Sequence, residues 1–207
     1  MLGTLEQYYK PWLLGKKKYL GGKGRSELRE SERLEVVKLS SNENVLGASP
    51  LALAAISGHL KQLHEYPERS DIRLRQALAR YYRNALSADA FLTASSASEV
   101  IDIICRALLE PGANVIVSGP TFLPFRVFAG NAGSVVRDVP LSDPDFLWDP
   151  EAILSAIDGN TRLVFVASPN NPTGTYIPAV VMKDFLDALP RHVGVVYDEV
   201  YHHLSLI

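Results

Sequence analysis

The chain has 207 residues, 47% of them hydrophobic, which is enough for a substantial core and one or two domains. Its 21 basic and 23 acidic residues nearly balance, so neither nucleic acid nor an anionic membrane is indicated as a partner. No apolar run approaches the roughly 18 residues of a membrane span, and the N-terminus lacks a signal-peptide core. The single cysteine, Cys105, lies in an apolar helical pattern. We therefore expect a cytoplasmic protein.

The first 35 residues are polar and interrupted by glycines, and they predict an arm rather than a core element. Two helices are predicted after it. Ser49-Pro50 offers an N-cap and a first-turn proline for a helix that runs to about His64. Ser70-Asp71 opens another, in which apolar residues recur near helical spacing up to Tyr82.

From residue 90 onward, short apolar runs alternate with helical patterns. Strands are predicted at 90–93, 114–117, 134–139, 162–167 and 193–197, and helices at 98–109, 124–130, 150–157 and 178–188. This alternation is typical of βαβ units, so we predict an α/β fold with a mostly parallel sheet and helices on both faces.

Polar residues follow two of the predicted strands. Residues 164–167 lead into S-P-N-N-P-T-G, and residues 195–196 into Y-D-E-V-Y. Ligands of open α/β sheets bind outside the carboxyl ends of strands, so Asn171, Asp198 and Tyr201 are expected in one site. An amide, a carboxylate and a phenol suit a planar, partly charged heteroaromatic ring better than a metal or a nucleotide. Asn171–Pro172 is a candidate cis peptide.

Two further candidates lie after predicted strands. The small residues Ser96-Ala97-Ser98 precede a helix, where backbone N–H groups and the helix dipole would favour a phosphate; a plain helix cap is the alternative. Phe122 follows residues 114–117 and could stack on a ring or simply pack in the core.

Other site chemistries are weakly supported. Asp198 could be a metal ligand of a nucleotide-binding domain, but the chain contains neither G-x-x-x-x-G-K-[ST] nor G-x-G-x-x-G. For Asn171 the structural alternative is turn chemistry, and for Tyr201 it is core packing. His202 and His203 are adjacent, but no second ligand pair is evident, so no metal site is expected.

These motifs resemble those of fold-type I pyridoxal-phosphate aminotransferases, most closely the histidinol-phosphate aminotransferase branch. Residues 39–47 (LSSNENVLG) resemble the branch's "sNENPlG" segment, with Val45 where proline is usual. Tyr66-Pro67-Glu68, followed by Leu74-Arg75, resembles its "YP…LR" segment. The resemblance runs in order from about residue 36 to the last residue.

The resemblance implies pyridoxal 5'-phosphate as cofactor and a role for each site residue. Ser96-Ala97-Ser98 would hold the phosphate, although the family usually has Gly, then Ser or Ala, then Asp or Asn. Phe122 would stack on the pyridine ring. Asp198 would keep the ring nitrogen protonated, so that the ring can act as an electron sink. Asn171 and Tyr201 would hydrogen-bond the ring hydroxyl, and Asp198 and Tyr201 are the expected catalytic residues.

The resemblance also implies a homodimer, because Tyr66 would reach the cofactor phosphate of the neighbouring subunit. Asn42 and Asn44 would lie near the substrate entrance. The implied reaction moves an amino group from an amino acid or amino phosphate to a 2-oxo acid or phosphorylated carbonyl compound, as in histidine biosynthesis. Related branches act on aromatic amino acids or aspartate, or decarboxylate a phosphothreonine.

The family's catalytic lysine, which forms a Schiff base with the cofactor, lies beyond the Y-D-E-x-Y motif, and Ile207 precedes that position. We therefore expect the chain alone to be inactive: part of a longer protein, a truncated product that binds cofactor phosphate or pairs with a complete subunit, or one of two chains sharing a site. Residues 1–45 would form an arm and a small-domain segment. Residues 46–207 would form the N-terminal part of the large domain, incomplete at its C-terminus.

Overall fold

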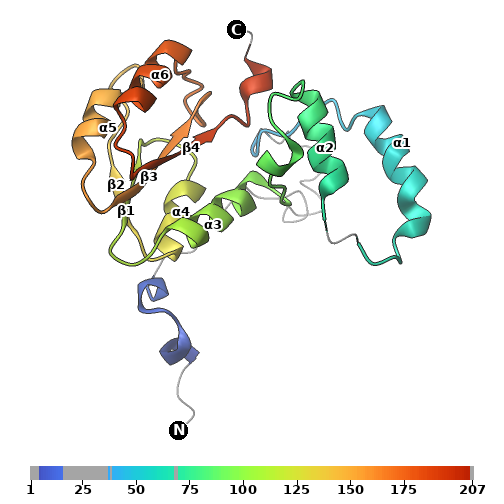
Figure 1. Ribbon diagram of the computed structural model, residues 1–207, viewed down its shortest axis with the longest axis horizontal. Helices are drawn as coiled ribbons and strands as arrows, with labels where there is room; N and C mark the ends of the chain where they lie inside the picture. The colour runs from blue at the N-terminus through green and yellow to red at the C-terminus, as the bar shows by residue number, and fades with distance from the viewer. Residues whose placement is uncertain (1–4, 16–36, 38, 68–69, 206–207) are drawn as a thin grey trace. The chain divides into compact units, whose positions relative to one another are not determined.

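The computed structural model describes residues 5–15, 37, 39–67 and 70–205 (Figure 1). The chain divides into two compact units, one of residues 1–16 with 92–207 and the other of residues 17–91. The predicted boundary lies elsewhere, after residue 45, where it separates an arm and a small-domain segment from the large domain. That division stays a prediction.

The regular structure described in the unit of residues 17–91 is helical. It contains α1 (Pro50–His59), a 3₁₀ turn (Leu60–Gln62), α2 (Ile72–Tyr81) and a second 3₁₀ turn (Ala88–Ala90). Pro50 begins α1 as predicted, but the Ser49 side chain makes no capping hydrogen bond. The Asp71 carboxylate does not cap α2 either; it accepts a hydrogen bond from Arg75 Nε at 2.7 Å, because Arg75 lies one turn along the same helix.

The unit of residues 92–207 contains a four-stranded parallel sheet of order β2-β1-β3-β4. Its strands are β1 (Asn114–Val117), β2 (Val135–Asp138), β3 (Thr161–Ala167) and β4 (Gly194–Asp198). Its helices are α3 (Ala97–Leu108), α4 (Pro124–Asn131), α5 (Pro150–Ala156) and α6 (Ala179–Ala188), followed by a 3₁₀ turn (His202–Leu204). The α/β fold with a parallel sheet is confirmed.

Alternate residues of the central strands point to opposite faces of the sheet. Val115 and Phe165 pack with α3 and α4 residues on one face, whereas Ile116, Val164 and Val166 pack with α5 and α6 residues on the other. Figure 1 shows the same two layers of helices on either side of β1 and β3. Helices therefore cover both faces, as predicted, and β1 is buried along its whole length.

Cys105 lies in the α3 layer and is fully buried. Burial away from water, helped by the nearby Asp102 charge, raises the pKa of its thiol to about 12. The side chain therefore behaves as the small hydrophobe that its sequence position indicates.

The predicted strand at 90–93 is wrong. Ala90 ends a 3₁₀ turn, and the residues after it have no regular structure. Phe91 has extended backbone angles, φ −104° and ψ 136°, and its ring stacks on Tyr82 with centroids 6.1 Å apart. Extended backbone becomes a strand only beside a neighbour that completes the hydrogen-bond ladder, and no described strand pairs with this segment.

Part of the predicted arm packs onto the sheet-containing unit. Residues 5–15 form two short 3₁₀ turns, Leu5–Tyr8 and Pro11–Leu13. Trp12 lies in the second, and its indole Nε1 donates a hydrogen bond to the Asn131 carbonyl at 3.0 Å, at the end of α4. The described piece of the arm is therefore anchored through one aromatic side chain.

Candidate functional site

All strands of the parallel sheet end at the same edge. The connection from β1 to β2 runs through α4 on one face, and the connection from β3 to β4 runs through α6 on the other. The chain therefore changes direction across the sheet between the neighbouring strands β1 and β3. Open α/β sheets bind ligands outside the carboxyl ends of the strands at such a switch point.

A pocket of about 100 Å³ lies at this edge. Its lining residues are Ala97, Phe122, Ala167, Pro169, Asn171, Asp198, Val200 and Tyr201. The structure therefore brings together five residues that the sequence singled out: Ala97, Phe122, Asn171, Asp198 and Tyr201. The sequence reasoning missed Ala167, Pro169 and Val200, although each lies inside or directly beside one of the two strand-end motifs.

Asp198 is the last residue of β4 and is half-buried. Its backbone carbonyl accepts a hydrogen bond from Ser168 N at 3.0 Å, which continues the β3–β4 ladder by one residue. Its carboxylate Oδ1 accepts from Val200 N at 3.0 Å. This local bond fixes the side chain, and a carboxylate has further lone pairs for a donor in the pocket.

The start of α3 is capped by two side chains in a variant of the capping box, in which Glu99 bonds the residue before the N-cap. Ser96 Oγ accepts a hydrogen bond from Glu99 N at 3.2 Å, and Glu99 Oε2 accepts one from Ser95 N at 2.7 Å. The Ser95 N–H bond lowers the pKa of the Glu99 carboxyl below its usual range. The helix-cap interpretation is therefore correct for Ser96. A cap leaves the hydroxyl proton of Ser96 and the first N–H groups of the helix able to meet an anion, so the phosphate role stays a prediction.

Phe122 lies at the end of a row of aromatic rings. Its ring meets that of Phe125 edge to face, with centroids 5.7 Å apart, and Phe125 stacks on Phe165 of β3 at 5.0 Å. Phe125 and Phe165 are buried, whereas Phe122 is half-buried and lines the pocket. The side chain therefore packs on the core and still presents surface to a ligand.

Asn171 belongs to the loop that follows β3. The peptide bond between Asn171 and Pro172 is cis, as predicted. The loop folds on itself, because Asn170 N donates to Thr175 O at 2.9 Å and Gly174 N donates to Asn170 O at 2.8 Å. Ile177 N closes the loop by donating to Ser168 Oγ at 2.9 Å. Turn hydrogen bonds are therefore present in this loop, made by Asn170 and its neighbours, while Asn171 lines the pocket. The role of Asn171 toward a ring stays a prediction.

Three predicted residues belong to the unit of residues 17–91. Asn44 closes a local turn, in which its Oδ1 accepts from Leu46 N at 3.0 Å and its Nδ2 donates to Gly47 O at 3.2 Å. Asn42 has a positive φ of 48°, which asparagine tolerates well. Tyr66 is 92% exposed. Their roles toward substrate and a neighbouring subunit stay predictions.

Within the described residues, no group of three or more His, Cys, Asp or Glu side chains could hold a metal ion. The helices in that same part of the chain are too short or too polar to span a bilayer.

Comparison with known proteins agrees with this architecture. The family model for aminotransferase class I and II matches residues 35–206. Histidinol-phosphate aminotransferase of Anoxybacillus flavithermus is 42% identical over 187 residues, which cover 90% of this chain and 49% of the relative. The enzyme of the same name from Geobacillus thermodenitrificans is 41% identical over 194 residues, or 93% of this chain and 52% of the relative.

Among solved structures, histidinol-phosphate aminotransferase from Sinorhizobium meliloti in complex with pyridoxal-5'-phosphate is similar with a TM-score of 0.80 and 27% identity. The match covers 95% of this chain and 52% of that chain. The chain spans about half the length of the curated relatives that it matches. With a family match over most of its residues and a parallel sheet that carries both motifs, it belongs to the aminotransferase class I and II family.

Proposed function

We propose that this chain supplies the N-terminal half of a pyridoxal-phosphate-dependent aminotransferase. The observation that carries the proposal is the single pocket in which Phe122, Asn171, Asp198 and Tyr201 meet the start of α3. These groups come from the loops after β1 and β3, from the end of β4 and the turn that follows it, and from the start of α3. Together they offer an aromatic face, an amide, a carboxylate and a phenol. That donor set fits a protonated pyridine ring with a hydroxyl group better than it fits a metal ion.

The start of α3 suits the phosphate of this cofactor. Ser96 and Ala97 carry small side chains, so oxygen atoms could approach the backbone closely, and the Ser96 hydroxyl can donate while its oxygen accepts from Glu99 N. The positive end of a 12-residue helix favours an anion there. Ser98 would add a second hydroxyl.

When bound, pyridoxal phosphate supplies an electron sink for the negative charge that develops at the α-carbon of the substrate. Asp198 would hold the proton on the ring nitrogen, because a carboxylate in a half-buried site stabilises a neighbouring cation. Asn171 and Tyr201 would donate hydrogen bonds to the ring hydroxyl oxygen and fix the tilt of the ring. Phe122 would limit its movement by stacking, which is worth about 0.5–1.5 kcal/mol beyond burial.

The relatives' names support histidinol phosphate as amino donor and therefore histidine biosynthesis. The proposed acceptor is 2-oxoglutarate. A homodimer in which Tyr66 reaches the neighbouring cofactor, a substrate entrance near Asn42 and Asn44, and a cytoplasmic location belong to the same proposal. The exposed Tyr66 ring is compatible with a contact outside its own unit.

Cofactor binding tests the proposal directly. The protein is titrated with pyridoxal phosphate, and Asp198→Asn is compared with Asp184→Asn, an exposed carboxylate of α6. Asp198→Asn keeps an acceptor for Val200 N but removes the charge, so affinity should fall about 10- to 150-fold, as for loss of a charged hydrogen bond of about 1.5–3 kcal/mol. Asp184→Asn should bind like the wild type. Equal affinity in all three would exclude Asp198 as the partner of the ring nitrogen.

Intact mass after borohydride reduction then separates the alternatives. An adduct of one reduced cofactor shows that a lysine reacts with it, and amino transfer from histidinol phosphate is then assayed against aspartate and aromatic amino acids. Reversible binding without an adduct identifies a cofactor-binding chain that needs a second polypeptide. No binding at all refutes the proposed function.

A further inference from the structure

One buried amide connects the two loops that flank the switch point. Asn170 is 7% exposed, and its side chain makes three hydrogen bonds. Its Oδ1 accepts from Thr121 Oγ1 at 2.7 Å, and its Nδ2 donates to Pro120 O at 2.9 Å and to Thr173 Oγ1 at 2.8 Å. Both N–H bonds of the amide and its carbonyl oxygen are therefore used inside the protein.

Two of these bonds join segments that are 49 and 50 residues apart in the chain. Pro120 and Thr121 directly precede Phe122 in the loop after β1. Asn170 directly precedes Asn171 in the loop after β3. Between residues 170 and 175 the backbone bonds stay within the second loop, as Gly174 N to Asn170 O does at 2.8 Å. The Asn170 side chain therefore relates the position of Phe122 to that of Asn171.

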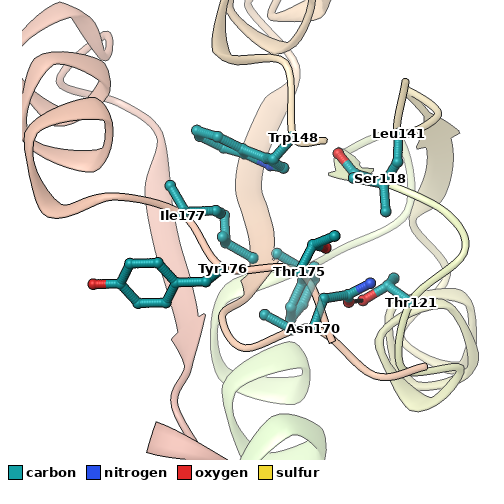
Figure 2. Close-up of a pocket in the computed structure, with 11 residues that line it drawn as sticks. Ser118, Thr121, Leu141, Trp148, Asn170, Thr175, Tyr176 and Ile177 are labelled. Carbon is teal, nitrogen blue, oxygen red and sulfur yellow. Dashed lines mark hydrogen bonds between the residues drawn. The ribbon is translucent and has the colours of Figure 1, made fainter. Parts of the chain in front are cut away.

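Side-chain packing holds the two loops together only in part. A cavity of about 20 Å³ lies beside Asn170, lined also by Ser118, Thr121, Leu141 and Trp148. Figure 2 shows Asn170 and Thr121 turned toward one another at one end of this cavity, with Trp148 at the other. This water-sized gap reduces the packing beside the amide, so the hydrogen bonds of Asn170 carry more of the contact between the two loops.

We propose that Asn170 is a positioning residue that sets the distance between Phe122 and Asn171 across the cofactor ring. The inference rests on the proposed function, because it assigns those two side chains to the ring. A carboxylate at this position could still accept from Thr121, but it would place an oxygen against the Pro120 carbonyl without a proton between them. Only an amide of this length satisfies both loops.

The test uses the full-length protein that carries this sequence. Asn170→Ala is compared with Asn160→Ala, which truncates an exposed asparagine before β3, at the far end of the sheet. The dissociation constant for pyridoxal phosphate and the circular dichroism of the bound cofactor are measured for both. Asn170→Ala should weaken binding about 10-fold or more and reduce the cofactor's dichroism, because the hydrogen bonds that hold the loop of Phe122 to the loop of Asn171 are lost. Asn160→Ala should change neither.

A merely structural role is distinguished in two ways. In a Phe122→Ala background, Asn170→Ala should lose most of its effect on affinity, because residues that act through one another are not additive. In cofactor-free protein, hydrogen exchange should accelerate in Asn170→Ala at the Gly174 and Phe125 amides, which donate to Asn170 O and Phe122 O, while β1 stays protected. If Asn170→Ala does not fold, Thr121→Val removes one of the three bonds and should show smaller changes of the same kind.

The outcomes separate the two proposals. Wild-type protein that does not bind pyridoxal phosphate refutes the proposed function, and the inference falls with it. Wild-type binding with unchanged affinity and dichroism in Asn170→Ala refutes the positioning role alone. A loss of affinity that adds fully to that of Phe122→Ala also refutes it.

Discussion

Gly133 lies where Trp12 of the N-terminal segment packs on the sheet-containing unit. A methyl group added at Gly133 should therefore destabilise the unit and weaken the packing of Trp12 on it. Its φ of +92° lies in the left-handed region, where an alanine costs about 1–2 kcal/mol. A Cβ on Gly133 would also lie 3.0 Å from Trp12 Cε2 and 3.1 Å from Pro111 Cγ. Overpacking of this kind typically costs about 1–3 kcal/mol unless a neighbour moves away.

Trp12 is the neighbour that can move, because it is half-buried and is held by its hydrogen bond to Asn131 O. Moving it loses that bond, about 0.5–1.5 kcal/mol, and part of its ring burial. We therefore expect Gly133→Ala to lower the free energy of unfolding by about 2–4 kcal/mol. In a Trp12→Ala background, the same substitution should cost about 1 kcal/mol less, since only the backbone strain and the Pro111 contact remain.

Urea unfolding of the wild type, both single variants and the double variant measures this coupling. Equal costs of Gly133→Ala in the two backgrounds would refute the reasoning, because Trp12 would then not be packed on Gly133. A cost near zero in both would contradict the left-handed backbone at Gly133 as well.

Three further results are expected. The pKa of the Asp158 carboxyl lies well below its usual range, because the carboxylate accepts hydrogen bonds from the Asn114 side chain and the Asn160 backbone. The Arg137 guanidinium lowers this pKa further. The stabilisation is therefore present above the unfolded-state pKa of about 4 and is lost as pH falls toward the folded pKa. The free energy of unfolding of the wild type should decline more steeply below pH ~4 than that of Asp158→Asn. Urea midpoints that fall in parallel for the two proteins would contradict this. Phe125→Ala removes a fully buried ring and should cost about 3–5 kcal/mol, against less than about 0.5 for the exposed Phe146→Ala, and comparable unfolding midpoints would refute the core assignment. The Cys105 thiol, with its pKa raised to about 12, should react with a thiol reagent at pH 8 only after denaturation, and rapid reaction of the native protein would show that α3 opens.

The local pattern determined much of this protein. Alternating helix and strand signals from residue 98 onward appear as α3 to α6 and β1 to β4, because the periodicity and length of each apolar run fit only one type of element. The strand-end motifs also identified Asn171, Asp198 and Tyr201, since parallel strands must end at a common edge.

Tertiary structure decided what depends on partners distant in the chain. Residues 90–93 have a strand-like composition but no described neighbour to pair with, so they are not a strand. Asp71 looks like a helix cap, yet Arg75 takes its carboxylate. Asn170 and Asn171 are neighbouring residues of the same type in one motif. Their environments differ because Pro120 and Thr121 approach the Asn170 side chain. Sequence specifies which groups a segment offers, whereas the contacts between distant segments determine which of those groups are used inside the protein and which remain for a ligand.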